Sequence, residues 1–217
     1  MTHLQWRGRG LLGTAGIVLA EPAELDIALA KAALAGKRDS ALGYANGAVA
    51  AAGDRPEPYA IRAEVLERVK APAADLRRAV DEALARGSQN GWILYRAADD
   101  RLADAGGRRA PPAQARAVAN LAEQAANADR RLRPAFDLIA RAVYLSDRVT
   151  EDDGNFLAAA RSRFPADRWI LIGQSAIARA HGDAEGAKRL TAMALGEGEG
   201  LSKSQLPEIR GFLFDKP

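Results

Sequence analysis

Residues 169–195 read WILIGQSAIARAHGDAEGAKRLTAMAL, and this stretch decides the fold. Trp169, Ile172, Gly173 and Ala176 are spaced so that bulky and small residues share one face of a helix. The sequence His181-Gly182-Asp183 then interrupts the pattern. A second apolar face follows at Ala187, Leu190, Ala194 and Leu195. The stretch therefore predicts two helices joined by a tight turn.

The same pattern begins at four earlier points in the chain. The bulky residues that open the five units are Leu25, Tyr59, Trp92, Phe136 and Trp169, separated by 34, 33, 44 and 33 residues. Three of these intervals match a helix–turn–helix repeat of about 34 residues. The longest interval contains an insertion of about ten residues around the glycine- and proline-rich stretch 105–112, which we do not expect to be helical. The chain therefore reads as a stack of similar units.

Apolar spacing predicts the individual helices. Paired helices are expected at 24–35 with 38–52, 58–69 with 75–86, 92–102 with 114–128, 136–143 with 156–164, and 169–177 with 187–195. A last helix at 201–214 is expected to cover the exposed end of the stack. Its apolar residues are Leu206, Ile209, Phe212 and Leu213. An irregular helical bundle without a superhelix is the alternative.

These residues resemble the tetratricopeptide repeat (TPR) family, whose unit places Trp, Leu-Gly and Tyr on its first helix and Ala, Phe and Pro on its second. The fifth unit matches best, through Trp169, Ile172-Gly173 and Ala176. Further matches are Phe136, Ile139-Ala140 and Val143 in the fourth unit and Leu25 and Ala28-Leu29 in the first. The third unit departs from the family, because Arg96 and Asp99 occupy positions that are small and apolar there.

The resemblance implies an all-α fold, a right-handed superhelical solenoid of about five helix–turn–helix (TPR-like) repeats with a C-terminal capping helix. It covers residues 22–199. Residues 1–21 form a leader, and residues 200–217 form a linker and the capping helix. The two ends therefore lie outside the repeats.

The leader has the layout of a secretory signal peptide. It contains the basic Trp6-Arg7-Gly8-Arg9, an uncharged apolar run at 10–19, and the small residues of Val18-Leu19-Ala20 at a cleavable spacing. A flexible segment or an extra helix is the alternative. The apolar run is too short to span a bilayer, which takes about 20 residues, and no other segment is expected to do so. With the Ala- and Arg-rich composition, the leader predicts a bacterial protein of the periplasm or cell envelope.

Composition limits the classes of partner and chemistry. The net charge of +3 comes from 31 basic and 28 acidic residues whose signs are interleaved, so no nucleic-acid partner is expected. The absence of cysteine excludes disulfides and thiolate metal sites, and it is compatible with a cytoplasmic location as well as a periplasmic one. We therefore expect a protein or peptide partner; the sequence does not predict the oligomeric state.

Catalytic and metal-binding signals are weak. Of the two histidines, His3 lies in the leader and His181 in a turn that ends a helix, where it complements the helix dipole. Glu151-Asp152-Asp153-Gly154 lacks the alternation of a calcium loop and is expected to be an acidic first helical turn. We therefore expect no catalytic residue, no metal site and no cofactor. An enzyme with a helical-repeat body would instead need a buried Glu or Asp in a deep pocket, and the sequence offers no candidate.

By resemblance, the first helices line a concave groove and expose one stripe of each to a partner. The candidate partner-binding residues are Asp26, Glu64, Glu67, Asp137, Arg141, Tyr144 and Gln174. The resemblance implies a non-catalytic protein–protein interaction scaffold that binds a peptide or protein in this groove. The alternative is a structural assembly subunit that oligomerises, or docks on a membrane-associated complex, through its ends and its C-terminal helix.

Overall fold

The computed structural model describes residues 22–36, 40–196 and 200–214, and in these ranges it contains eleven α-helices, two 3-10 turns and no β-strand. The first six helices are α1 (Pro22–Ala35), α2 (Ala41–Ala51), α3 (Pro56–Arg68), α4 (Ala73–Ala85), α5 (Gly91–Asp104) and α6 (Pro112–Ala128). The remaining five are α7 (Arg133–Leu145), α8 (Glu151–Arg163), α9 (Arg168–Ala180), α10 (Ala184–Leu195) and α11 (Leu206–Phe214). The 3-10 turns are η1 (Gly107–Arg109) and η2 (Lys203–Gln205).

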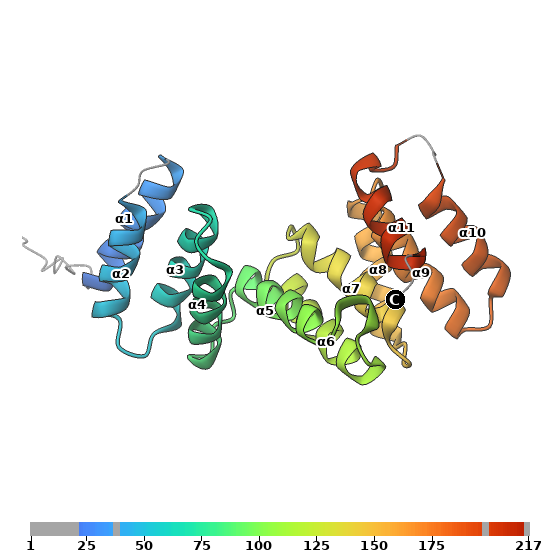
Figure 1. The fold of residues 1–217 in the computed structure, drawn as a ribbon, viewed down its shortest axis with the longest axis horizontal. Coiled ribbons are helices and arrows are strands. Elements are labelled where there is room, and N and C mark those ends of the chain that lie inside the picture. The colour runs from blue at the N-terminus through green and yellow to red at the C-terminus, as the bar shows by residue number, and fades with distance from the viewer. Residues whose placement is uncertain (1–21, 37–39, 197–199, 215–217) are drawn as a thin grey trace, which may run out of the picture.

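The helices form five successive hairpins, from α1/α2 to α9/α10, and α11 follows them. Figure 1 shows the hairpins following one another from α1 at one end of the molecule to α10 at the other. They do not gather around one shared centre. The predicted all-α solenoid of five hairpins is confirmed, and the irregular bundle is wrong.

The first helices of neighbouring hairpins lie close together. α1 packs on α3, α5 on α7, and α7 on α9. In the described part of the chain, the second helices of neighbouring hairpins make no more than marginal contact. Helices of a curved stack approach each other on its inner side, so the first helices form the concave surface. The remaining step, from α3 to α5, is bridged by polar side chains.

Side chains at the helix starts satisfy the free backbone N–H groups. The Asn90 side chain accepts hydrogen bonds from the backbone of Trp92 and Ile93 at the start of α5. Thr150 and Asp153 form a reciprocal capping box at the start of α8. The acidic stretch 151–153 is therefore the first turn of a helix, as predicted.

The core consists largely of alanine, isoleucine, leucine and valine, joined by the bulky residues that open three of the units. Tyr59, Phe136 and Trp169 are buried. Leu25 was expected to play the same role in the first unit, but its side chain is 55% exposed, so that prediction is wrong. α1 instead buries Ala23, Ala30 and Ala33. Among the described residues, no hairpin lies before α1 to cover Leu25.

The third unit is rotated relative to the prediction. α5 buries Ile93, Leu94, Ala97, Ala98 and Leu102, whereas Trp92 is only half-buried. Arg96 and Asp99, which depart from the family pattern, are also half-buried. The rotation places Trp92 at the edge of the core and turns Arg96 and Asp99 toward the concave surface.

The insertion and the C-terminal segment meet. The stretch expected to be non-helical contains the short turn η1, and Arg108 in this turn donates a hydrogen bond to the carbonyl oxygen of Gly211 in α11, at 3.2 Å. The predicted helix at 201–214 is divided into η2 and α11. α11 packs on α9 and α10, as expected of a cap, and Ile209 is fully buried there.

Residues 1–21, including the predicted leader, lie outside the described residues. In the described part of the chain, none of the helices has the length and apolar character that crossing a membrane requires.

Candidate functional site

Two adjoining clefts lie on the concave surface and share Glu64. The first, of about 330 Å³, is enclosed by α1, α3 and the turn before α5. It is lined by Ile27, Lys31, Pro56, Glu57, Ala60, Ile61, Glu64, Ser88, Gln89 and Asn90. The second, of about 550 Å³, is lined by Leu34, Glu64, Glu67, Arg68, Lys70, Trp92, Asp129 and Leu132. Together they form one open region, which we call the Glu64 cleft.

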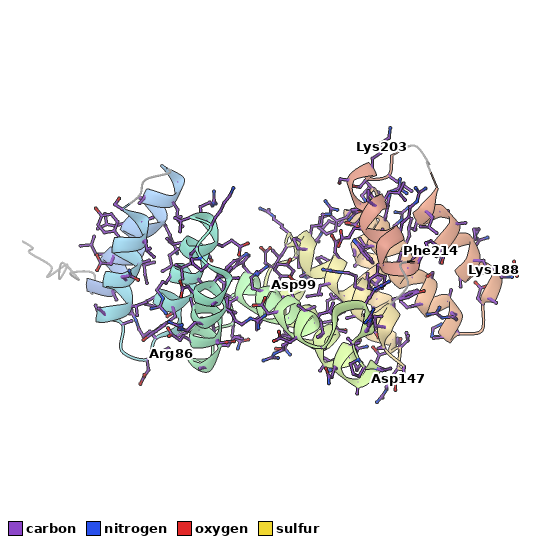
Figure 2. The ribbon with its side chains drawn as sticks, in the orientation of Figure 1. Arg86, Asp99, Asp147, Lys188, Lys203 and Phe214 are labelled. Carbon is purple, nitrogen blue, oxygen red and sulfur yellow. The ribbon has the colours of Figure 1, made fainter. Side chains whose placement is uncertain are left out.

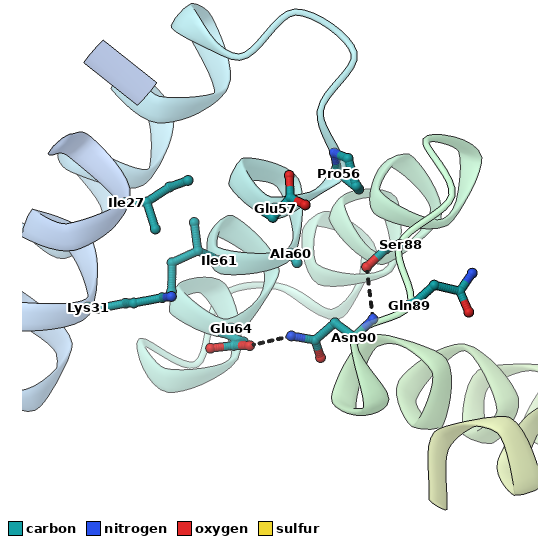
Figure 3. Close-up of a pocket in the computed structure, with 10 residues that line it drawn as sticks. All are labelled: Ile27, Lys31, Pro56, Glu57, Ala60, Ile61, Glu64, Ser88, Gln89 and Asn90. Atoms are coloured by element: carbon teal, nitrogen blue, oxygen red, sulfur yellow. Dashed lines mark hydrogen bonds between the residues drawn. The ribbon is translucent and has the colours of Figure 1, made fainter. Parts of the chain in front are cut away.

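Glu64 is held in place by the start of the next hairpin. The Nδ2 atom of Asn90 donates a hydrogen bond to Glu64 Oε1 at 3.2 Å, while the other amide atom of Asn90 caps α5. Figure 3 shows Glu64, Asn90 and Lys31 around the first cleft. Burial raises the pKa of Glu64, and the Asn90 hydrogen bond and the nearby Lys31 oppose this rise. The capping residue thus joins α3 and α5 at the cleft.

A chain of ion pairs continues from the Glu64 cleft along the concave surface. Its nitrogen–oxygen distances are 3.6 Å for Arg96–Glu67, 3.5 Å for Arg96–Asp99, 3.5 Å for Arg141–Asp99 and 3.8 Å for Arg141–Glu208. The pairs connect α3, α5, α7 and α11. Figure 2 shows Asp99 near the middle of the molecule. Charges on this surface are therefore largely compensated within the chain.

Three of the predicted groove residues lie under the segment formed by η2 and α11. The Nε2 atom of Gln205 donates to Asp137 Oδ2 at 3.4 Å, and Arg141 pairs with Glu208. The ring of Tyr144 meets the ring of Phe212, with centroids 5.8 Å apart. Figure 1 shows α11 in front of the helices of the fourth and fifth hairpins. The concave surface is therefore open around Glu64 and covered by the chain itself over α7.

The other predicted residues are dispersed. Glu64 and Glu67 both line the Glu64 cleft. Asp26 is half-buried against α2, close to Gly47. Gln174 is half-buried on α9, apart from both groups of residues. The structure therefore brings together Glu64 with Glu67, and Asp137 with Arg141 and Tyr144, but not all seven residues.

Two half-buried carboxyl groups have strongly raised pKa values. Burial and the neighbouring Asp167 raise the pKa of Asp137 to about 8. Burial and the neighbouring Asp153 raise the pKa of Glu123 to about 7. Neither carboxyl lines the Glu64 cleft. Both carboxyl groups belong to hydrogen-bond networks that join helices. Separately, the described residues include no group of three or more side chains suited to hold a metal ion.

The sequence missed several residues of this surface. Asn90 lies between two expected helices and Trp92 opens the third unit, but neither of them, nor Lys31, is among the predicted groove residues. Arg96 and Asp99 were noted only as departures from the family pattern. That departure was itself a usable signal, because two charged residues on a first helix fit a concave surface better than a core.

Comparisons with known proteins identify the fold. No family model matches the sequence, and no curated protein matches it significantly. Among solved structures, the chain is similar to YrrB, described as a TPR protein with an unusual peptide-binding site. The TM-score is 0.57 at 15% sequence identity, over 81% of this chain and 86% of YrrB. The chain therefore has a TPR-like helical-repeat fold.

Proposed function

We propose that the chain is a non-catalytic protein-interaction scaffold that holds a peptide or protein segment in the Glu64 cleft. The observation that carries this proposal is that α1, α3 and α5, from three successive hairpins, line one open region on the concave surface. Such a region exists only when the hairpins are stacked, so binding depends on the repeat architecture. The similarity to YrrB supports the proposal, because that protein is described as having a peptide-binding site.

The lining indicates the kind of segment that fits. The cleft offers apolar surface at Ile27, Leu34, Trp92 and Leu132. It offers charges of both signs at Lys31, Glu57, Glu64, Glu67, Arg68, Lys70 and Asp129. A half-buried tryptophan is a frequent anchor for a partner side chain. The fitting partner is an extended segment in which apolar residues alternate with charged ones.

The proposal includes the bacterial cell envelope as the location. Its support is the sequence of residues 1–20, which combines a basic start, a short apolar run and small residues before Glu21. Mass spectrometry of the amino terminus of the purified protein tests it. A mature chain that begins at Glu21 supports export, and an intact residue 1–20 segment contradicts it.

The binding surface is tested with charge and size changes. Peptides selected from a displayed library on the wild-type chain should bind Trp92→Ala and Glu64→Lys at least tenfold more weakly, a loss of about 1.4 kcal/mol or more. The matched control is Arg101→Glu, because Arg101 is exposed nine residues after Trp92 and thus on the opposite side of α5. Equal binding to all variants, or an equal loss in the control, would contradict the assignment of the Glu64 cleft.

A further inference from the structure

The segment formed by η2 and α11 contacts α7 through three side-chain pairs that follow the same order along both segments. The pairs are Asp137 with Gln205, Arg141 with Glu208, and Tyr144 with Phe212. The paired residues span seven positions on each segment, which corresponds to about two helical turns. The side chains of this segment therefore reach about two turns of α7, while α11 itself packs on α9 and α10. The C-terminal segment is therefore seated in the concave surface as a helical partner would be.

The surface beneath α11 combines aromatic rings with guanidinium groups. The Phe212 ring stands edge-on to Trp169, with centroids 5.0 Å apart and an interplanar angle of 86°. The guanidinium of Arg141 lies 5.5 Å from the centre of the Trp169 ring, and that of Arg179 lies 5.0 Å from the centre of the Tyr144 ring. Two aromatic rings flanked by two cations favour a helix that carries an aromatic residue and a carboxylate.

α11 leaves part of the hydrogen-bonding capacity of this surface unused. The Nε atom of Arg141 is buried and has no hydrogen-bond partner. The Glu208 carboxylate that faces Arg141 is 3.8 Å away, and its side chain is 58% exposed. A buried donor without a partner is costly, whereas a carboxylate that meets two guanidinium nitrogens binds strongly. A helix with a better-placed carboxylate would therefore gain an interaction that α11 does not make.

We propose that the surface formed by Arg141, Tyr144, Trp169 and Arg179 is a second binding site, for an amphipathic helix of another protein that carries a carboxylate one turn before an aromatic residue. α11 occupies this site in the free chain and is displaced when the partner binds. The proposal does not rest on the Glu64 cleft, because it concerns a different part of the concave surface. Partner binding competes with an intramolecular segment, so the apparent affinity is lower than the intrinsic one.

The test uses the full-length chain and a fluorescent peptide of residues 201–214 as the helical probe. The variant Glu208→Lys/Phe212→Ala opposes Lys to Arg141 and removes the aromatic contact, which weakens the docking of α11 while leaving the acceptor surface intact. The peptide should bind this variant at least tenfold more tightly than the wild type. Adding Arg141→Glu should weaken that binding at least tenfold. The control Arg210→Glu changes an exposed residue of α11 outside the three pairs and should bind as the wild type does.

Amide hydrogen exchange of α11 makes each outcome decisive. Fast exchange in the double variant together with no peptide binding would overturn the proposal, since the open surface would then not accept a helix. Continued protection of α11 in that variant would overturn the claim that α11 is displaced. A wild-type dimer that the peptide dissociates, measured by light scattering, would assign the surface to α11 of a second copy and overturn the assignment to another protein.

Discussion

Gly173 of α9 lies against Ala140 of α7 so closely that a β-carbon on Gly173 would stand 2.8 Å from the Ala140 β-carbon. The same β-carbon would stand 2.6 Å from Cδ1 of Leu157 in α8. Ala140 and Leu157 are themselves fully buried, so neither has free space to move into. Three helices of the fourth and fifth hairpins thus meet at one residue without a side chain. This contact gives the Leu-Gly position of the repeat its physical basis.

Gly173→Ala should therefore destabilise the chain by about 1–3 kcal/mol, because overpacking outweighs the helix propensity gained from alanine. Urea unfolding followed by circular dichroism measures the effect. The matched control is Gly154→Ala in α8, where an added β-carbon meets no atom within 4 Å. The control should be neutral or should stabilise by up to about 1 kcal/mol. Equal stability of the two variants would show that the close contact is absent.

Arg116 joins α6 to the start of α8. Its NH1 atom donates to both carboxylate oxygens of Asp153, at 2.9 and 2.7 Å, and its NH2 atom donates to Glu123 at 2.8 Å. Because Asp153 is fully buried, Arg116→Ala leaves a buried charge without its partner and should cost about 3–5 kcal/mol. The exposed pair Lys188–Glu185 is the comparison, and Lys188→Ala should leave the free energy of unfolding almost unchanged. A similarly small loss for Arg116→Ala would contradict the network.

The raised pKa of Asp137 makes stability depend on pH. The folded chain binds this proton below pH about 8, whereas the unfolded chain binds it only below about 4. The free energy of unfolding therefore falls as pH rises from about 4 to about 8, by up to about 1.4 kcal/mol per pH unit. Burial disfavours the charge of Asp167, but hydrogen bonds from Asp137, Arg133 and Gln205 keep its pKa below the usual value. The titration of Asp167 therefore changes the free energy of unfolding only at more acidic pH.

Asp137→Asn should flatten this dependence between pH 7 and 9, because the amide donates to Asp167 as the protonated acid does. Glu123→Gln is the control: the pKa of Glu123 is about 7, so that variant should flatten the dependence below pH 7 and not above it. Urea unfolding at several pH values measures both slopes. If the free energy of unfolding of Asp137→Asn varied with pH between 7 and 9 as in the wild type, Asp137 would not hold the proton between itself and Asp167.

Arg168 holds the end of α10 and the segment before α11. Its buried guanidinium donates to the carbonyl oxygens of Ala194 and Gly196, at 2.6 and 2.7 Å, and of Ser202, at 2.6 Å. Arg168→Met keeps the aliphatic stem but removes these donors, so we expect a loss of roughly 2–4 kcal/mol and faster amide exchange at the end of α10 and in α11. Exposed Arg189 offers the control Arg189→Met. If amide hydrogen exchange in Arg168→Met were the same as in the wild type, Arg168 would not hold these two segments in place.

Local sequence was sufficient to predict the repeat architecture. Spacing of three and four residues identified the helices, and glycine and proline marked the turns between them. The intervals between Tyr59, Trp92, Phe136 and Trp169 identified the repeat and its insertion. These features were predictable because helix formation and turn chemistry depend on residues that are close in sequence.

The candidate site was predictable only in part. Glu64 and Glu67 were singled out and line a cleft, but Asn90 and Trp92, which complete it, were not. A rotation of about 100° decides whether Trp92 or the next residue, Ile93, is buried, and that rotation depends on how α5 packs against α6 and α7. Spacing along one helix does not contain this information.

The sequence by itself determined that the chain forms paired helices of similar length, stacked with one inserted loop. Only the tertiary structure decided which face of each first helix lines the concave surface, and that α11 contacts both Tyr144 of α7 and Arg108 of the insertion. The physical reason is how far apart in sequence the contacting residues lie. Periodicity reports contacts within a few residues, whereas α11 is positioned by Arg108, Tyr144 and Trp169, which lie between about 40 and 100 residues away from it in sequence.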